Sequence, residues 1–468
     1  MSIDQWEEYF GPSDARVEKA EDISNYFYQT DVLDRMKMGE RSSGVSIVVG
    51  VKGSGKTAIR KMIEFSRQRL SLVWTVDRQY SFDSAQAGSH PAGVESLVIS
   101  LLTAGVLEQI QENSTEFSTK VRGRVQGTVK RIGSLLGALA KSTTLAAGPI
   151  ELDLSKISAD VVKEFSRIPA AVYREELAQY LEEKVCYILM DDVDQVFYGC
   201  ASNPAFLEGL IEAVNTINLE FGALLHCLLF LRAGPYWTYR RTAKAYDKTR
   251  RSIGAITWTE RELGELVARR IRHIGQVTAG EKAWRTWARD FAPSTRAGIG
   301  EIQDYVLSRC PRGPRDAIDF CNLAKKGAGQ RKITMGDIKD AEAQHSADQL
   351  DFLRVEFGAE YPRINDLLKE VFTGRNLVWP RGELAKLTND SICADTNLKE
   401  RFGKLQYLRT SYPAEFMRLM YDIGFIGYRT NDESEFVYAM SHPEPAIDLP
   451  GAFEHSIHPA YMKHLHLR

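Results

Sequence analysis

The sequence has few cysteines, no long hydrophobic run and almost no net charge. Its six cysteines show no CxxC or other metal-ligand spacing, which predicts reduced core residues. The longest apolar stretch, residues 223–231, is interrupted by His226 and is much shorter than the roughly 20 residues of a membrane helix. The N-terminal segment is acidic and lacks the apolar core of a secretory signal. We therefore expect a cytoplasmic protein that makes no membrane contact.

The low net charge of −2 means that no global field attracts nucleic acid. Nucleic-acid binding would have to come from local clusters of Lys and Arg. With 468 residues, of which 44% are hydrophobic and 26% charged, the chain has the composition of a globular protein. Its length predicts two or three domains.

Five apolar runs have the length and β-branched content of buried strands, and helical patterns lie between them. This alternation predicts the α/β class, with a parallel sheet sandwiched by helices as in P-loop NTPases. We place the sheet in a core over residues 41–259, with a helical insertion at about 103–167. The predicted strands are residues 45–49, 70–76, 185–190, 224–231 and 253–258.

Other regions flank this core. Residues 1–40 form a lead-in with one amphipathic helix at about 20–36. Residues 260–350 are helical throughout and predict a lid. Residues 351–468 predict two helices, at 364–372 and 381–387, and then a helix, a strand, a polar turn and the strand FVYAM. That order is typical of a winged-helix-like domain, although hairpins follow helices in many folds.

The run GVKGSGKT at residues 50–57, which we call the glycine loop, fits GxxxxGK[ST] between a predicted strand and a predicted helix. Glycines let the backbone N–H groups turn inward around phosphate oxygens. Lys56 is predicted to reach the β- and γ-phosphates and Thr57 to bind Mg²⁺, with help from the positive end of the helix. The predicted ATP-binding residues are Gly50, Gly53, Ser54, Gly55, Lys56, Thr57 and Ala58.

Two aspartates follow the predicted strand at residues 185–190. A parallel strand delivers the residues after it to the carboxyl edge of the sheet, where ligands bind in this class. Asp191 is predicted to hold Mg²⁺, and Asp192 to position or deprotonate the attacking water. Asp194 is a reserve candidate for the second role. Taken alone, the aspartates also fit a helix cap, but together with the glycine loop they predict a magnesium site.

Three arginines are candidates for contacting the γ-phosphate. Arg232 ends the strand predicted at residues 224–231, and Arg312 and Arg315 stand near a helix start in the lid. Among the lid arginines we favour Arg315, and for each of the three a structural ion pair is the competing interpretation. Aromatic residues precede the glycine loop and could stack near adenine or lie in the core: Tyr26, Phe27 and Tyr28.

The run YRRTAKAYDKTRR, residues 239–251, interleaves basic residues with tyrosines. It could bind nucleic-acid phosphates or supply an arginine finger to a neighbouring subunit, while a solvated helix face is the more common explanation. The basic residues of the run are Arg240, Arg241, Lys244, Lys248, Arg250 and Arg251.

The motifs GVKGSGKT, ILMDDVDQ and FLRAG resemble the STAND and origin-recognition branches of AAA+-related ATPases. The segments PRDAIDFCNLA, DIKDAEAQHSADQL and IHPAY look similar to bacterial P-loop ATPases associated with antiphage defence. The resemblance implies an ATP-dependent switch in which nucleotide closes the lid and hydrolysis or release reopens it. It assigns matching roles to Lys56, Thr57, Asp191, Asp192 and Arg232. Classical AAA+ members carry Glu where Asp192 stands, which argues against rapid turnover.

These observations support several hypotheses for function. The first is a homo-oligomeric ATPase subunit of a bacterial antiphage defence complex, which controls a separate effector or sensor protein. The alternative is a DNA-binding initiator or transposition-helper ATPase that uses the basic run or the C-terminal domain. A nucleotide-bound scaffold that does not hydrolyse ATP is a third.

Overall fold

The computed structural model divides into two compact units. We call Gln29–Val51 with Lys56–Ile256 the sheet unit, and Met1–Tyr28, Lys52–Gly55 and Thr257–Arg468 the C-terminal unit. The residues that the structure describes are 10–39, 44–67, 71–76, 82–83, 91–92, 94–95, 98–99, 102, 106, 185–191, 197–198, 204–222, 225–244, 246–275, 283–287, 302–329, 331–358, 361–393, 395, 398, 400, 402, 412–443 and 445–468. Apart from Val106, the insertion predicted at 103–167 lies outside them.

The sheet unit contains the predicted parallel sheet, whose five strands have the order β2-β4-β6-β1-β7. In this order, β6 lies between the strand that precedes the glycine loop and the strand that precedes Asp191. The register sets Gly50 at the end of β1 opposite Arg232 at the end of β6. The strands are β1 (Ile47–Gly50), β2 (Ser71–Val76), β4 (Val185–Met190), β6 (Leu225–Arg232) and β7 (Ile253–Ala255).

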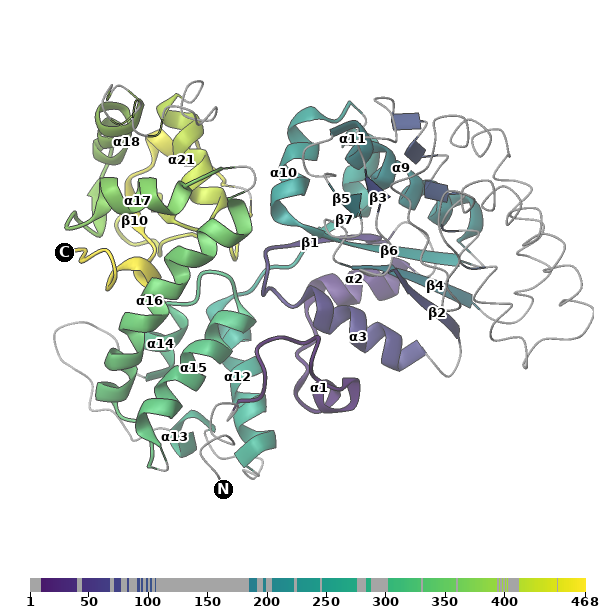
Figure 1. The fold of residues 1–468 in the computed structure, drawn as a ribbon, viewed down its shortest axis with the longest axis horizontal. Coiled ribbons are helices and arrows are strands. Elements are labelled where there is room, and N and C mark those ends of the chain that lie inside the picture. The colour runs from purple at the N-terminus through teal and green to yellow at the C-terminus, as the bar shows by residue number, and fades with distance from the viewer. Residues whose placement is uncertain are drawn as a thin grey trace, which may run out of the picture. The chain divides into compact units, whose positions relative to one another are not determined.

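The sheet forms because its central strands are apolar on both faces. Every residue of β1 is buried, and six of the eight residues of β6 are buried. Helices α9 and α10 lie on one side of the sheet and α2 and α3 on the other (Figure 1). The unit also holds a short parallel pair, β3 (Phe82–Asp83) and β5 (Phe197–Tyr198). Its helices are α2 (Asp31–Gly39), α3 (Lys56–Arg67), α9 (Pro204–Phe221), α10 (Ala233–Thr242) and α11 (Tyr246–Thr249), with the 3₁₀ turn Arg250–Ser252.

The single helix predicted at residues 20–36 is wrong, because two helices occupy this region. The first, α1 (Ala20–Tyr26), ends where Phe27 takes an extended conformation, with ψ of 131°. The second, α2, begins at Asp31. The two helices belong to different units, α1 to the C-terminal unit and α2 to the sheet unit.

The helical region of the C-terminal unit packs around one apolar core, which includes Phe10, Trp287 and Phe320. Its longest helix, α16, starts with a capping box in which Thr334 and Asp337 satisfy each other's backbone N–H groups. The helices of this region are α12 (Glu260–Gly275), α13 (Ala283–Trp287), α14 (Ile302–Leu307), α15 (Pro314–Ala328) and α16 (Met335–Phe357).

The end of the chain adds a three-stranded antiparallel sheet with the order β8-β10-β9. Its strands are β8 (Val378–Pro380), β9 (Ile426–Arg429) and β10 (Glu454–Ile457). The helices around it are α17 (Ile364–Phe372), α18 (Glu383–Thr388) and α21 (Pro413–Asp422), with the π-helical turn Asn389–Cys393 and the 3₁₀ turns Leu449–Gly451 and Pro459–Tyr461.

The strand predicted at FVYAM is wrong, since only Val437 pairs with β9, in an isolated bridge to Tyr428. Beyond this bridge the chain turns, and the carbonyl oxygen of Tyr438 accepts hydrogen bonds from the backbone of Ser441 and His442. The regular partner of β9 is β10, which is much later in the sequence. The local sequence pattern therefore predicted that β9 pairs with another strand, but it predicted FVYAM as the partner instead of β10.

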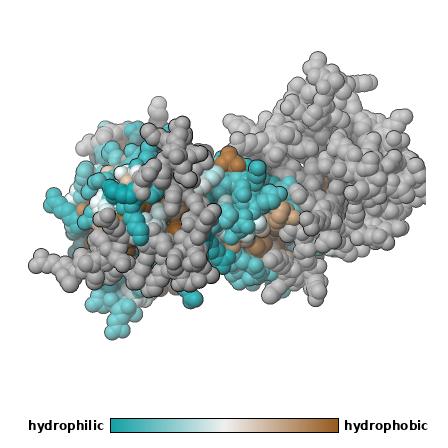
Figure 2. Space-filling model, turned by 90° about the horizontal axis from the view of Figure 1, so that it is seen from below, coloured by the Kyte–Doolittle hydropathy of each residue, from teal (hydrophilic) through white to brown (hydrophobic). Residues whose placement is uncertain are grey.

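The described surface carries few large apolar side chains. On the face in Figure 2, hydrophilic residues cover most of the part that is not grey. Four cysteines, at positions 186, 227, 310 and 321, are buried with free thiols, as predicted for core residues, whereas Cys393 is only half-buried and Cys200 lies outside the described residues. No helix among the described residues is both long and apolar enough to cross a bilayer. The most exposed large apolar residues are Val17, Leu219, Val355 and Tyr412.

Candidate nucleotide site

The glycine loop turns sharply between β1 and α3. Gly53 and Gly55 have φ angles of +90° and +103°, which residues with a Cβ rarely adopt. A Cβ on Gly53 would also lie 2.8 Å from the Cβ of Arg315, whereas a Cβ on Gly55 would come no closer than 3.9 Å to Trp258. The backbone path therefore needs glycine at both positions, and the packing at Gly53 needs it as well.

Lys56 is the first residue of α3 and reaches back along the loop. Its Nζ donates hydrogen bonds to the carbonyl oxygens of Gly50 and Val51, at 2.6 and 3.0 Å. The ammonium group therefore lies beside the first turn of the loop. Because α3 starts here, the partial positive charge of the helix N-terminus falls on the loop, and Ala58 lies in the first helical turn.

The structure brings the two predicted magnesium ligands into contact. Thr57 Oγ1 donates a hydrogen bond of 2.9 Å to Asp191 Oδ2, although the residues are 134 positions apart. Asp191 directly follows β4 and is only 6% exposed. A hydroxyl and a buried carboxylate thus meet at the carboxyl edge of a parallel sheet, where ligands of such sheets bind.

Arg60 is a member of this cluster that the sequence analysis missed. Its Nε lies 3.3 Å from Asp191 Oδ2, and its Nη1 lies 3.0 Å from Glu64 on the next helical turn. Arg60 stands three residues after Thr57 on α3, so both side chains share one face of the helix. This spacing of three residues was the feature of the sequence that could have identified Arg60 as a neighbour of Thr57. The guanidinium group fixes the orientation of the Asp191 carboxylate.

The donor set fits a magnesium ion. Hydroxyl and carboxylate oxygens are hard ligands, which Mg²⁺ prefers, and it usually completes its shell with water and phosphate oxygens. The described residues hold no cluster of three or more His, Cys, Asp or Glu side chains, and such a cluster is not needed here. Ser54 adds a buried hydroxyl within the loop that has no hydrogen-bond partner among the described residues.

The other predicted residues of the sheet unit are placed only in part. Asp192 and Asp194 lie outside the described residues. Arg232 ends β6 directly opposite Gly50, and its side chain is half-buried. Thus the backbone register places Arg232 beside the start of the glycine loop, as its strand-end position predicted.

The two lid arginines make structural contacts. Arg312 is buried and forms an ion pair with Asp316, and its guanidinium carbon lies 3.3 Å from the centre of the Phe352 ring. Arg315 donates its backbone N–H to the carbonyl oxygen of Gly53 at 3.3 Å, and its side chain lies 3.5 Å from Asp14. Arg315 therefore contacts the glycine loop through its backbone, while its guanidinium group forms the kind of ion pair that the competing interpretation predicted.

Asp14 takes part in two such pairs. Burial alone would raise its pKa, but its hydrogen bonds with Arg16 and the charge of Arg315 hold the pKa at about 2. This carboxylate is consequently ionised at neutral pH and attracts the Arg315 side chain.

Trp258 and Glu356 contact the loop and were also missed by the sequence analysis. Trp258 Nε1 donates a buried hydrogen bond of 2.9 Å to the carbonyl oxygen of Ser54. A carboxylate oxygen of Glu356 accepts from the backbone N–H of Lys52 at 3.2 Å. Neither residue belongs to a recognisable motif, so no signal in the sequence could have identified them.

The aromatic residues that precede the loop lie in two kinds of environment, the buried core and the neighbourhood of the glycine loop. Tyr26 is buried, with its ring 4.3 Å from the guanidinium carbon of Arg270. Tyr28 is half-buried, and its ring centre lies 5.9 Å from that of Trp258. Phe27 is also half-buried. Tyr26 is therefore a core residue, and Tyr28 lies next to the tryptophan that contacts the loop.

The basic run is not one helix face, because α10, α11 and a 3₁₀ turn divide it. Its tyrosines pack inward: Tyr239 is fully buried, and the Tyr246 hydroxyl lies 3.1 Å from that of Tyr236. The side chain of Arg241 lies outside the described residues, and Arg240 is half-buried. The exposed cations are Lys244, Lys248, Arg250 and Arg251.

Comparison with protein families identifies one part of the chain. Residues 261–354 match the family described as the FunZ-associated C-terminal helical domain. No curated protein matches the chain. The matched segment extends from α12 into α16 and covers nearly the same residues as the lid predicted at 260–350. The chain therefore contains a region similar to that helical domain.

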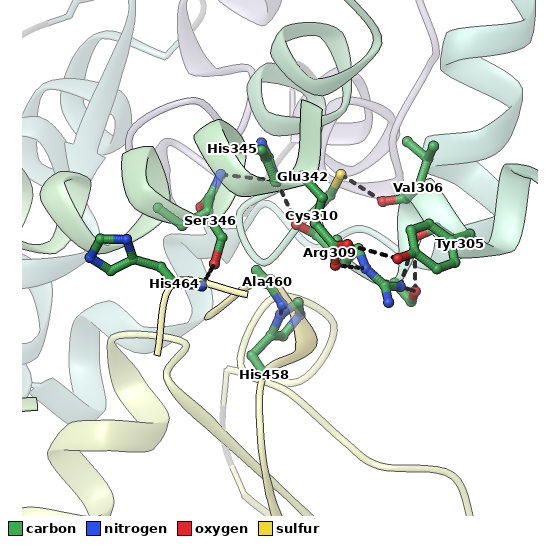
Figure 3. Close-up of polar contacts among 12 residues, drawn as sticks. Tyr305, Val306, Arg309, Cys310, Glu342, His345, Ser346, His458, Ala460 and His464 are labelled. Carbon is green, nitrogen blue, oxygen red and sulfur yellow. Dashed lines mark hydrogen bonds and ion pairs between the residues drawn. The ribbon is translucent and has the colours of Figure 1, made fainter. Parts of the chain in front are cut away.

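A buried polar network lies within this matched segment and ties the end of the chain to it (Figure 3). Arg309 Nε and the Tyr305 hydroxyl both donate to the Glu342 carboxylate, at 2.5 and 2.7 Å. His345 contacts the carbonyl oxygen of Arg309 at 2.8 Å. Near the C-terminus, the backbone N–H of His464 donates to Ser346 at 3.0 Å. These contacts hold α14, α16 and the last residues in one arrangement.

Proposed function

We propose that this chain binds ATP with Mg²⁺ and hydrolyses it, so that it works as a nucleotide-controlled switch. The observation that carries the proposal is the 2.9 Å hydrogen bond between Thr57 and Asp191, at the end of a glycine loop that follows a parallel strand. A strand, a glycine turn and a helix N-terminus form a phosphate-binding unit, and an adjacent carboxylate adds the means to hold Mg²⁺.

Each residue has a role in this proposal. The loop N–H groups and Lys56 bind the phosphates, and Thr57 and Asp191 hold the magnesium ion. When bound, the ion supplies positive charge that neutralises the phosphate oxygens. Arg60 keeps the Asp191 carboxylate in place through its 3.3 Å contact. Asp192 positions the attacking water, and its short side chain favours slow turnover.

Arg232 and Arg315 are the candidate contacts to the γ-phosphate. For Arg232, the support is its place opposite Gly50 at the strand end. For Arg315, it is the backbone contact with Gly53. The Arg315 side chain would have to leave Asp14, and their separation of 3.5 Å makes that ion pair a loose one.

The first test compares Lys56→Ala and Thr57→Ala with the wild type. We measure ATP binding by calorimetry with and without Mg²⁺, and turnover by phosphate release. Lys56→Ala should abolish detectable binding, because it removes the cation that contacts the phosphates. Thr57→Ala should remove the Mg²⁺ dependence of binding and reduce turnover at least 100-fold, because a magnesium ligand is lost.

Matched controls are Lys339→Ala and Thr242→Ala, which alter exposed residues of the same types. Both should behave like the wild type. Absence of ATP binding by the wild type at millimolar concentration would overturn the proposal. Binding that is unaffected by either loop substitution would place the nucleotide elsewhere.

We propose further that the switch acts in the cytoplasm within a larger assembly, as the homo-oligomeric ATPase subunit of a bacterial antiphage defence complex. The support is the motif resemblance together with the segment similar to the FunZ-associated helical domain. A separate effector or sensor protein would then respond to the nucleotide state.

The alternative is a DNA-binding ATPase. One observation favours it, because the last domain has the element order of a winged helix. Along the chain the elements are α17, β8, α18, α21, β9 and β10, and β10 lies between the other two strands in the sheet. Two observations oppose DNA reading by this domain. Most of α21 is buried, and its Arg418 is paired with Asp422 at 2.7 Å. The turn after β9 exposes acidic side chains, namely Asp432, Glu433 and Glu435.

A duplex titration at low salt separates the two functions. The alternative predicts binding that weakens steeply with salt and on replacing Lys244, Arg250 and Arg251 by Ala, because phosphate contacts release counterions. We expect no such binding. Salt-dependent binding that these substitutions weaken would establish the alternative.

A further inference from the structure

Three consecutive residues of the glycine loop are held by the C-terminal unit, to which they belong. The N–H of Lys52 donates to Glu356 near the end of α16. The carbonyl oxygen of Gly53 accepts from the backbone of Arg315 at the start of α15. The carbonyl oxygen of Ser54 accepts from the indole N–H of Trp258. The hydrogen bond from Trp258 is the shortest of these three contacts. It is also the contact in which a neutral side chain is the donor.

A fixed carbonyl group also fixes the N–H group of the same peptide unit. In a trans peptide, C=O and N–H point in opposite directions from one plane, and no described peptide of this chain is cis. The hydrogen bond from Trp258 to Ser54 therefore turns the N–H of Gly55 away from Trp258. In the same way, the contact from Arg315 to Gly53 orients the N–H of Ser54. Phosphate-binding loops work by presenting such N–H groups together on one side.

The indole ring is itself held on several sides. Trp258 is 3% exposed, and its backbone N–H donates to the carbonyl oxygen of Met440 at 3.3 Å. Gly313 approaches the ring so closely that a Cβ at this position would lie 2.9 Å from Cδ1 of Trp258. Gly313 has a φ of +105° and is the cap residue of α15. Trp258 thus contacts the loop and the start of α15 through its side chain, and the segment that follows the Val437 bridge through its backbone.

We propose that Trp258 is a positioning residue of the nucleotide site: it orients the Gly55 N–H for phosphate binding and transmits nucleotide binding to α15 and the C-terminal domain. This inference rests on the proposed function. It assigns Trp258 no contact with the reacting atoms. It makes the affinity for nucleotide depend on a residue 204 positions away from its partner in the loop.

The test uses Trp258→Phe in the full chain, which keeps an aromatic ring but removes the N–H donor. Loss of one neutral hydrogen bond predicts ATP binding about fivefold to tenfold weaker by calorimetry. The matched control is Trp284→Phe. Trp284 is also buried in the C-terminal unit and donates its indole N–H to a backbone carbonyl, that of Gly264 at 3.2 Å. This control should leave ATP affinity unchanged.

A spectroscopic readout separates positioning from a general structural role. The protein, which has seven tryptophans, is labelled with 5-fluorotryptophan, and the ¹⁹F signal missing in Trp258→Phe identifies Trp258. This signal should shift when Mg-ATP is added to the wild type and stay unchanged in Lys56→Ala. If Trp258→Phe does not fold, the signal is assigned by elimination with the other tryptophan variants, and the wild-type titration still decides.

The outcomes are distinct. Weaker binding in Trp258→Phe together with an ATP-induced shift of its signal supports the inference. ATP binding with no shift at Trp258 overturns the inference and leaves the proposed function standing. No ATP binding by the wild type overturns the proposed function and the inference with it.

Discussion

At the scale of single residues, Gly53 combines two requirements that are usually separate. Its φ of +90° favours glycine, and the space where a Cβ would lie is filled by Arg315 at 2.8 Å. Gly313 also meets both requirements, whereas some other glycines meet only the first. Gly374, for example, has a φ of +74° but no atom within 4 Å of a Cβ position. The comparison of the two glycines isolates the effect of close packing at the loop.

Gly53→Ala should therefore abolish ATP binding, whereas Gly374→Ala should only lower stability. Each substitution forces a residue with a Cβ into a left-handed conformation, which costs about 1–2 kcal/mol. Only at Gly53 must Arg315, and with it the loop backbone, also move. Calorimetric ATP titrations and thermal unfolding of both variants check this. Equal ATP affinity in the two variants would show that packing against Arg315 is unimportant.

At the scale of elements, two buried histidines lie on segments that pack together: His345 is on α16, and His458 directly precedes the 3₁₀ turn Pro459–Tyr461. His458 is 4% exposed, and its Nδ1 accepts from the backbone of Ala460 at 3.2 Å. Burial lowers its pKa to about 3; the negative charge of Asp316 acts in the opposite direction and the positive charge of Arg309 in the same direction. Burial also lowers the pKa of His345 on α16. Both imidazoles are therefore neutral in the folded chain at neutral pH.

This arrangement predicts a loss of stability in mild acid. Between its folded pKa of about 3 and an unfolded value near 6.5, His458 binds its proton only in the unfolded chain, so stability falls as pH falls. At pH 5 the loss from His458 alone should reach about 2 kcal/mol relative to pH 8. His458→Asn keeps an acceptor for Ala460 but cannot titrate in this range.

Denaturant unfolding at pH 8, 6.5 and 5 measures this effect. The decline toward pH 5 should be smaller in His458→Asn than in the wild type, while His442→Asn, which alters an exposed histidine, should leave the decline unchanged. Identical pH dependence in all three proteins would show that His458 is accessible to protons in the folded state.

At the scale of the whole molecule, the glycine loop belongs to both units. Gly50 and Val51 lie in the sheet unit with Lys56 and Thr57, whereas Lys52–Gly55 lie in the C-terminal unit. We propose that nucleotide bound at this loop controls the state of the whole chain.

Nucleotide-dependent assembly tests this switch. The mass measured by light scattering should rise with Mg-ATP in the wild type and remain that of the nucleotide-free protein in Lys56→Ala, since this variant cannot bind the phosphates. The same mass measurement with Mg-ADP shows whether assembly needs the γ-phosphate or only a bound nucleotide. A mass independent of nucleotide in the wild type, with ATP binding intact, would rule out control through assembly.

The sequence by itself determined the strands of the parallel sheet, the glycine loop and the position of Asp191, because strand composition and glycine spacing are local properties. Only the tertiary structure decided which of these segments meet. It brought Thr57 to Asp191, added Arg60 and Trp258, and paired Arg315 with Asp14. It also divided the predicted helix at 20–36 and gave β9 the distant partner β10. Such contacts depend on how distant segments pack, which a local pattern of residues does not encode.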